Sequence, residues 1–317
     1  MTKTQLPHAQ LPQTQLPIIQ GLWIGDELSR VEHHSILSWI HLGYTYHLYT
    51  YHPVKNIPSN TIIKDAREII PESDIFYYNG SITPFSDLFR YKLLYDRGGV
   101  WTDCDIFAIQ QFPTNIDMAF VTERTILKGA FSNCTRKPPI VCKDHKVLNS
   151  FIYTKYHKNP IMYKMYEIAN TARLAILSRA SPPLHRKNAS VKHRQTHAQK
   201  HTLKNIGLKS YHWRGGSETL EREIRKHNMT QYIMRPEFAF PINWWDFKYA
   251  FKGDIEIIPP SRGWNTPINI NNILQGNHGH TFMITIHNGW IKKQKLDKNK
   301  LYPSNSLYER IILTHTT

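Results

Sequence analysis

The sequence predicts an α/β fold built around a parallel sheet. Short apolar runs that are typical of strands alternate with longer segments whose apolar residues recur at helical spacing. Strands are predicted at 18–24, 44–51 and 100–102, and helices at 27–42 and 85–95. Because helices separate successive strands, this order favours parallel strands with ligands at their carboxyl ends.

The first elements follow from local signals. The strand at 18–24 is a short apolar run that ends at Gly25 and Asp26. The helix at 27–42 has its apolar residues at helical spacing, and Gly43 closes it. The segment 44–51 is rich in aromatic residues and threonine, as strands are. A short helix at 65–70 and a strand-like piece at 75–78 come next.

The last strand of the series leads into two acidic residues. The helix at 85–95 is broken by two glycines, and the strand at 100–102 runs directly into Asp103-Cys104-Asp105. Residues two apart on a strand point the same way, so both carboxylates can face one site. Such a pair suits Mn²⁺ or Mg²⁺, although an isolated Asp-x-Asp is also common in solvated turns.

The positive charge is concentrated in two segments. The chain has 317 residues, 40 Lys+Arg against 24 Asp+Glu, and a net charge of +16. Residues 168–217 hold ten cations and no acidic residue, and residues 292–300 hold five lysines and one aspartate. Charge of this kind suggests a nucleic-acid-binding protein, but the basic stretch lacks interleaved aromatic residues and any recognisable nucleic-acid-binding module.

Composition narrows the cellular setting. The three cysteines do not form a disulfide framework, and no apolar run reaches about 18 residues. We therefore expect a cytosolic protein without a spanning helix. A Gln-Leu-Pro repeat opens the chain and predicts an extended tail.

Two sequence blocks resemble a known family. The run from Thr83 to Asp105, TPFSDLFRYKLLYDRGGVWTDCD, resembles the block of glycosyltransferases that carry the DXD sugar-binding region. Residues 17–25, PIIQGLWIG, resemble the first strand of the same group. The chain is thus identified as similar to glycosyltransferase family 32 and to bacterial lipooligosaccharide α-galactosyltransferases.

The resemblance implies a GT-A, Rossmann-like sheet that binds a nucleotide sugar, with a helical, variable acceptor-side region. It assigns Asp103 and Asp105 to metal binding and catalysis, with Asp105 as the more direct ligand. Asp87 and Arg90 match residues that hold the donor sugar, and a structural ion pair between them is the alternative. Trp23 matches the uracil-stacking position, and a place in the core is equally open for it.

Three further residues are assigned by shorter matches. Residues 148–160 resemble a segment at the reacting face of the donor, which makes Asn149 a candidate near the anomeric carbon. Residues 284–290, ITIHNGW, resemble the block of the family that is written AIHLWxxSW. There, His287 matches a third metal or diphosphate ligand, and Trp290 a residue close to the diphosphate.

The implied reaction is the metal-dependent transfer of a hexose, with galactose favoured, from a UDP-sugar with retention of configuration. Mn²⁺ or Mg²⁺ is the expected cofactor, and a glycolipid or oligosaccharide such as lipooligosaccharide is the expected acceptor. The enzyme is expected on the cytoplasmic face of the inner membrane, bound peripherally to anionic lipid, with no nucleic acid as partner. A metal-dependent phosphohydrolase is a further alternative.

The chain is expected to divide into four parts. These are a flexible tail, a nucleotide-sugar-binding part, an acceptor-side part with a basic loop at 178–212, and a basic, amphipathic C-terminal segment: 1–17, 18–130, 131–290 and 291–317. Within the last part, residues 304–313 predict a short amphipathic helix. That helix suits either an anionic membrane surface or packing against the body.

Overall fold

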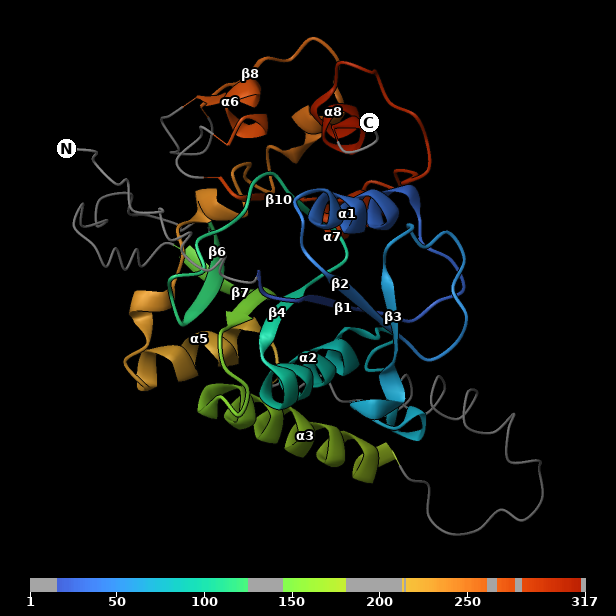
Figure 1. Cartoon of the computed structure of the whole chain (residues 1–317), viewed down its shortest axis with the longest axis vertical. Helices are drawn as coiled ribbons and strands as arrows, with labels where there is room; N and C mark the ends of the chain where they lie inside the picture. The colour runs from blue at the N-terminus through green and yellow to red at the C-terminus, as the bar shows by residue number, and fades with distance from the viewer. Residues whose placement is uncertain are drawn as a thin grey trace, which may run out of the picture.

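A six-stranded sheet forms the centre of the molecule (Figure 1). The computed structural model describes residues 16–124, 145–180, 213, 215–260, 267–276 and 281–314. The strand order is β3-β2-β1-β4-β7-β6, and β7 runs antiparallel to both of its neighbours. The strands are β1 Ile19–Trp23, β2 Tyr46–Thr50, β3 Ile62–Asp65, β4 Gly99–Thr102, β6 Met118–Arg124 and β7 His145–Thr154.

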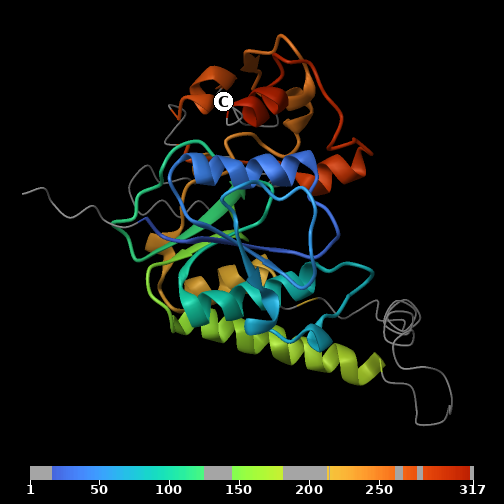
Figure 2. The same ribbon diagram turned by 45° about the vertical axis from the view of Figure 1, so that its right-hand side comes forward.

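Helices cover both faces of this sheet (Figure 2). Helix α1 (Arg30–His41) lies on one face, and α2 (Thr83–Arg97) and α3 (Pro160–Ala180) lie on the other. Helix α5 (Ser217–Lys226) joins the α2–α3 side, where its Leu220 and Ile224 belong to the same buried apolar cluster. Each face of the sheet therefore has its own core.

The C-terminal part forms a third layer beyond α1. It holds β5 Ile106–Ala108 paired with β10 Met283–Thr285, a small pair of β8 Ile257–Ile258 and β9 Ile268–Asn269, and the helices α6 Ile270–Leu274, α7 Asn288–Lys293 and α8 Leu307–Leu313. Short 3₁₀ helices lie between the longer elements, at Ala66–Glu68, Glu72–Asp74, Thr230–Tyr232, Pro236–Phe238 and Phe247–Phe251. The chain thereby leaves the sheet at β4, contributes β5 to this layer, and then returns.

Helix α1 is fixed at its start and along its buried face. A capping box joins Ser29 and Glu32, in which the Ser29 backbone N–H donates to the Glu32 carboxylate at 3.1 Å. On the buried face, the Ser35 hydroxyl and the Trp39 indole N–H each donate to the Ile106 carbonyl at 2.9 Å. These bonds tie α1 to β5, directly after the two aspartates.

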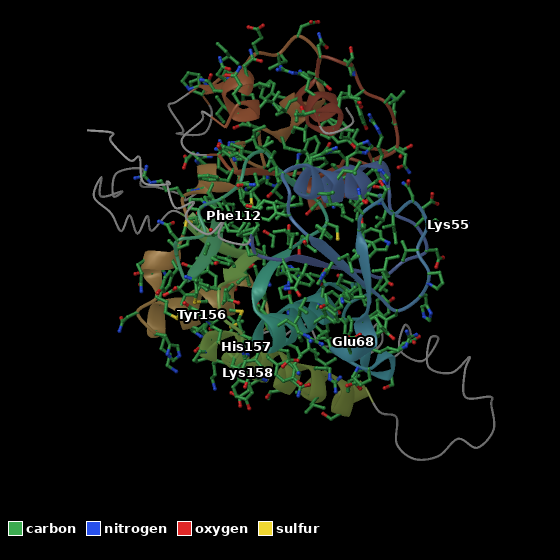
Figure 3. All side chains as sticks on the ribbon, viewed as in Figure 1. Lys55, Glu68, Phe112, Tyr156, His157 and Lys158 are labelled. Atoms are coloured by element: carbon green, nitrogen blue, oxygen red, sulfur yellow. The ribbon has the colours of Figure 1, made fainter. Side chains whose placement is uncertain are left out.

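The turn from α2 to β4 requires two glycines. Gly98 and Gly99 have φ values of +67° and +81°, which L side chains rarely adopt. A Cβ on Gly98 would lie 2.9 Å from the backbone nitrogen of His157, in the turn between β7 and α3 that Figure 3 labels. A Cβ on Gly99 would lie 2.9 Å from the Ile18 carbonyl oxygen. The close approach of three chain segments is therefore possible only without side chains.

The predicted α/β class is confirmed, and the mainly parallel sheet between helices is consistent with a GT-A-like fold. The prediction of a strand-like piece at 75–78 is wrong, because only an isolated bridge between Tyr78 and Ser81 forms there. Strand β3 is missing from the prediction, since it is an edge strand whose Ile62 and Ile63 are exposed side by side without alternation. The basic loop predicted at 178–212 lies outside the described residues from 181 onward.

The C-terminal segment forms the predicted helix α8. Of the two expected locations, a membrane surface or the body of the protein, the helix packs against the body. Leu307, Tyr308, Ile311 and Ile312 are fully buried among apolar residues of the C-terminal layer. The apolar face of α8 is therefore not exposed for a membrane. Among the described residues, no helix combines the length and the hydropathy needed to span a bilayer.

Replacing Gly98 with alanine should lower the free energy of unfolding by about 2 kcal/mol, because the new Cβ meets backbone atoms at a positive φ. Gly80→Ala is the matched control, since Gly80 has a φ of +76° but nothing within 4 Å of the added Cβ. It should cost only about 1 kcal/mol. Urea unfolding followed by circular dichroism measures both, and equal losses would show that the contact with the β7–α3 turn is unimportant.

Candidate active site

Asp103 and Asp105 lie at the carboxyl end of β4, as predicted. Both line one small cavity of about 200 Å³, together with Trp23 at the end of β1 and Arg90 on α2. Asp103 continues β4, and its backbone N–H donates to the Ser150 carbonyl of β7 at 2.8 Å. The Asp105 carbonyl accepts from the Ile286 N–H at 2.8 Å, which brings the residues after β10 to the same place.

The two carboxylates differ in their partners. Asp103 accepts from the Trp101 indole N–H at 2.9 Å and pairs with Arg90 at 3.3 Å, with its side chain 36% exposed. No cation among the described residues forms an ion pair with Asp105. Burial, and then the nearby charge of Asp103, raises the pKa of Asp105 to about 8. The site therefore disfavours a second negative charge beside Asp103 unless a cation joins the pair.

Arg90 is the cation that organises this site. Its side chain is only 3% exposed and pairs with Asp87 at 3.2 Å and with Asp103 at 3.3 Å. The guanidinium lies 4.8 Å from the ring centre of Trp101 and donates to the carbonyl oxygen of Asn149 on β7. The ion pair between Arg90 and Asp87, one of the two roles considered for them, is therefore present.

Asp87 is held from several directions. Its carboxylate accepts from the Trp213 indole N–H at 2.7 Å and from the Asn149 side-chain amide at 2.8 Å. Burial is the largest influence on Asp87 and raises its pKa to about 6, against the opposing effect of Arg90. Asp87 lies behind Arg90 rather than on the wall of the small cavity. A direct contact with a sugar thus stays a prediction for Asp87.

Asn149 sits at the centre of a polar network on β7. Besides binding Asp87, its side-chain NH₂ group donates to the Tyr91 hydroxyl at 3.1 Å. Its side-chain oxygen Oδ1 accepts from the Ser217 hydroxyl at 3.0 Å. The side chain is thus fixed in orientation by α2 and α5. Its role near the reacting carbon stays a prediction.

Trp23 lies between two cavities. It lines the aspartate cavity and also a neighbouring one of about 660 Å³, whose wall includes Tyr51, Glu72 and Tyr77. Its ring is half-buried against the core around α1, and its indole nitrogen is buried without a hydrogen-bond partner among the described residues. Trp23 therefore packs on the core, which is one of the two interpretations, and its stacking on a base stays a prediction.

The predicted set of Asp103, Asp105 and His287 is not brought together. The described part of the chain contains no group of three His, Cys, Asp or Glu residues placed to hold a metal. The His287 ring packs against Phe240 and Phe247, with centroids 5.6 and 4.9 Å away. The resemblance located the sequence block that contains His287, but it did not predict which way each side chain points at the start of α7.

Trp290 likewise turns into the C-terminal core. Its ring stacks on Phe251 with centroids 5.8 Å apart and meets Phe247 edge-on at 5.9 Å. It does not line the aspartate cavity in the described structure. A contact between Trp290 and a diphosphate therefore stays a prediction.

Asn288 and Glu32 are cavity residues that the sequence analysis missed. Asn288, the residue after His287, lines the aspartate cavity, and its side-chain oxygen is buried without a partner among the described residues. Glu32 lines the same cavity, is 1% exposed, and accepts from Lys298. The Ser29-x-x-Glu32 capping pattern was the only local signal for Glu32, and it indicates a helix start rather than a site.

This geometry defines a class of protein: an α/β fold with paired carboxylates at the carboxyl edge of its sheet. Residues 68–171 match the family described as "Capsular polysaccharide synthesis protein". The matched stretch holds α2, β4, both aspartates and Asn149. The match supports a glycosyltransferase.

Solved structures include similar chains. One is the "PaToxG Glycosyltransferase", which is 16% identical, with a TM-score of 0.35, over 67% of this chain and 70% of that chain. No curated protein sequence matches the chain. The similarity to known proteins therefore rests on the family match over residues 68–171.

The burial of His287 should make the free energy of unfolding depend on pH. Burial lowers its pKa to about 4, against 6.5 for an ordinary histidine. The folded protein thus holds His287 neutral. The free energy of unfolding is therefore unaffected by this group above pH 6.5, and it decreases as the pH falls from 6.5 towards 4. The loss of unfolding free energy should reach about 3 kcal/mol.

Urea unfolding between pH 7 and pH 4 measures this effect. His287→Gln should make the stability less sensitive to acid over that range, although it lowers stability at pH 7. The control is His157→Gln, which replaces an exposed histidine and should leave the acid sensitivity unchanged. The same acid sensitivity in the His287 variant would contradict the assignment.

Proposed function

We propose that this protein is a metal-dependent, retaining glycosyltransferase that moves a hexose from a UDP-sugar to a cell-surface glycan. The observation that carries this proposal is the joint placement of Asp103, Asp105, Arg90 and Trp23 on one cavity at the carboxyl edge of the sheet. In α/β folds with parallel strands this edge is where nucleotides bind. The match to a family of polysaccharide synthesis supports the same class of reaction.

The two neighbouring cavities suit the two halves of a nucleotide sugar. The cavity of about 660 Å³ has the size of a small-molecule site and would take the nucleoside. Trp23, on its border, would stack on the base. The smaller cavity beyond Trp23 would then hold the diphosphate, beside Arg90 and the two aspartates.

Asp103, Asp105 and Asn288 fit a divalent cation. All three line the small cavity and offer the hard oxygen atoms that Mn²⁺ and Mg²⁺ prefer. The unpaired oxygen of Asn288 supplies the independent support, since a buried carbonyl without a donor is costly unless something binds it. Asp105 is the principal ligand, because Asp103 is already engaged by Arg90 and Trp101. When bound, the ion would act as a Lewis acid towards the leaving diphosphate.

The chain's own groups would hold the donor in place. Arg90 faces the small cavity and offers positive charge to the diphosphate or to a sugar hydroxyl. Asp87 and Asn149 fix its guanidinium from behind, so its position does not change on binding. Retention, with attack from the face that UDP leaves, follows the family resemblance, and we assign no protein base.

The acceptor is proposed from the comparisons. The matched family's description names capsular polysaccharide synthesis, so a capsular glycan is the first acceptor to test, and lipooligosaccharide is the second. Galactose is the hexose favoured by the resemblance. Attachment to anionic lipid is part of this proposal, and it would use the four exposed lysines of residues 292–300: Lys292, Lys293, Lys295 and Lys300.

Release of UDP from UDP-galactose, UDP-glucose and UDP-GlcNAc, with and without Mn²⁺, tests the reaction. We expect slow, metal-dependent release that accelerates when an acceptor glycan is added. Asp105→Asn should reduce the rate about 100-fold or more, because it removes a charge on which the site depends. Asp117→Asn, on an exposed loop, is the control and should retain the activity. Release that no acceptor accelerates would favour the phosphohydrolase alternative instead.

The metal ligands can be distinguished by Mn²⁺ binding measured by calorimetry. Asn288→Ala should weaken the affinity about tenfold, and Asn288→Asp should restore it, since a carboxylate oxygen replaces the amide oxygen. His287→Gln should change the affinity less than twofold, because its ring packs between aromatic side chains. The reverse pattern would return the third ligand to His287.

A further inference from the structure

A second large cavity lies at the amino edge of the sheet, away from the aspartates. It has a volume of about 670 Å³ and is lined by the starts of β1, β2 and β4, by residues around the end of β7, and by Lys64 and Glu68 at and after the end of β3. Gln20 of β1 lines this cavity, whereas Trp23 of the same strand lines the aspartate cavity. Gln20 and Trp23 are three residue steps apart along the strand, which is about 10 Å. The two cavities are therefore different sites.

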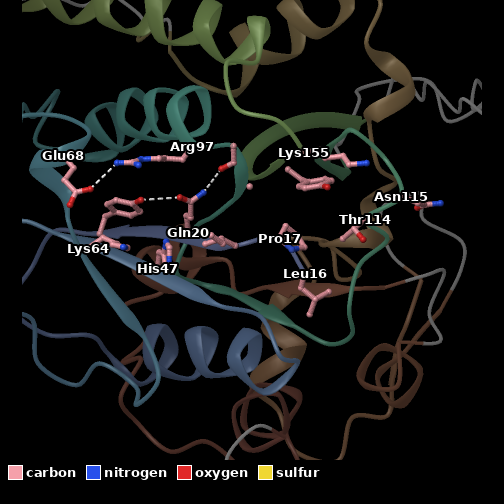
Figure 4. Close-up of a pocket in the computed structure, with 15 residues that line it drawn as sticks. Leu16, Pro17, Gln20, His47, Lys64, Glu68, Arg97, Thr114, Asn115 and Lys155 are labelled. Atoms are coloured by element: carbon pink, nitrogen blue, oxygen red, sulfur yellow. Dashed lines mark hydrogen bonds and ion pairs between the residues drawn. The ribbon is translucent and has the colours of Figure 1, made fainter. Parts of the chain in front are cut away.

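Cations surround this amino-edge cavity. Figure 4 shows Lys64 and Arg97 on one side, Lys155 on the other, and Gln20 between them. Glu68 is the one carboxylate among the lining residues of the described structure. Burial, then Lys64, then Arg97 lower the pKa of His47. An anion is the ligand that this arrangement of charge favours.

The floor of the cavity is rigid, and one of its cations is available. The Gln20 side-chain amide donates to the Gly98 carbonyl at 2.7 Å and accepts from the Tyr49 hydroxyl at 3.4 Å. Arg97 pairs with Glu68 at 3.3 Å, but both side chains are more than half exposed, at 53% and 52%. Exposed pairs of this kind contribute little, so Arg97 can exchange Glu68 for a ligand at small cost.

The polar rim and the rings indicate the kind of anion. Tyr49 and Tyr153 are each only 3% exposed, so neither offers a free face on which a base could stack. Thr114 and Asn115 add a hydroxyl and an amide, and Glu68 adds an acceptor for hydroxyl groups. Several donors and acceptors around a cationic wall match a sugar that carries an acidic group.

We propose that the amino-edge cavity binds a phosphate- or carboxylate-bearing saccharide, held by Lys64, Arg97 and Lys155. This site is separate from the aspartate cavity, and the proposal stands on the cavity itself rather than on the transferase reaction. In a protein that handles glycans, such a site would anchor an acidic sugar unit while the chemistry proceeds at the other edge of the sheet.

Calorimetry with the full chain, at low salt and without Mn²⁺ or nucleotide, tests this proposal. Glucose 6-phosphate and glucuronate are the two anionic probes, and glucose is the neutral one. We expect at least one anionic probe to bind, about tenfold or more tighter than glucose. The two anionic probes together show whether a phosphate or a carboxylate is preferred.

Substitutions of exposed or half-exposed side chains locate the binding. The Lys64→Gln, Arg97→Gln double variant and Lys155→Gln should each weaken the anionic probe about tenfold. Glu68→Gln should strengthen it severalfold, because it removes the opposing charge and frees Arg97. A gain in affinity from this variant would not follow from damage to the fold.

Two controls separate this site from others. Lys158→Gln, on the exposed turn labelled in Figure 3 and outside the cavity lining, should leave affinity within twofold. Asp105→Asn should also leave it unchanged, so failure of the transferase proposal would not affect this result. Unchanged affinity in the cavity variants, equal binding of glucose, or tighter binding of UMP at this cavity would each overturn the proposal.

Discussion

The buried guanidinium of Arg90 is the interaction on which the rest of the site depends. It joins α2 to β4 through Asp103, to its own helix through Asp87, and to β7 through the Asn149 carbonyl. A buried charge is tolerated only when its partners are complete, so the helix and the two strands are held in one relative position. The aspartate cavity has a fixed wall for this reason.

That wall faces the carboxyl edge of the sheet, where acidic side chains gather. Asp103 and Asp105 share it with Glu32, and among them Asp103 pairs with Arg90 and Glu32 pairs with Lys298. At the amino edge the balance is reversed, with cations in excess. The cations of that cavity come from the end of α2, from β3 and from the residue that follows β7, so segments distant in the chain build this second site.

Local sequence signals predicted the elements that carry these edges, and they failed where packing decides. The two glycines after α2 and the strand before Asp103 are visible because turn residues and apolar runs act locally. The exposed edge strand β3 has no alternation to reveal it. The amphipathic helix α8 was compatible with a membrane or a core, and its burial against the C-terminal layer depends on residues far away in the chain.

The sequence by itself determined the α/β order, the place of the aspartate pair at a strand end, and the helix that carries Asp87 and Arg90. The tertiary structure decided which neighbours complete the site. It turned His287 into an aromatic core and Asn288 towards the aspartates, and it brought Trp213 to Asp87 across 126 residues of sequence. Periodicity fixes the face on which a residue lies within its own element, whereas side-chain directions at a junction follow from long-range packing.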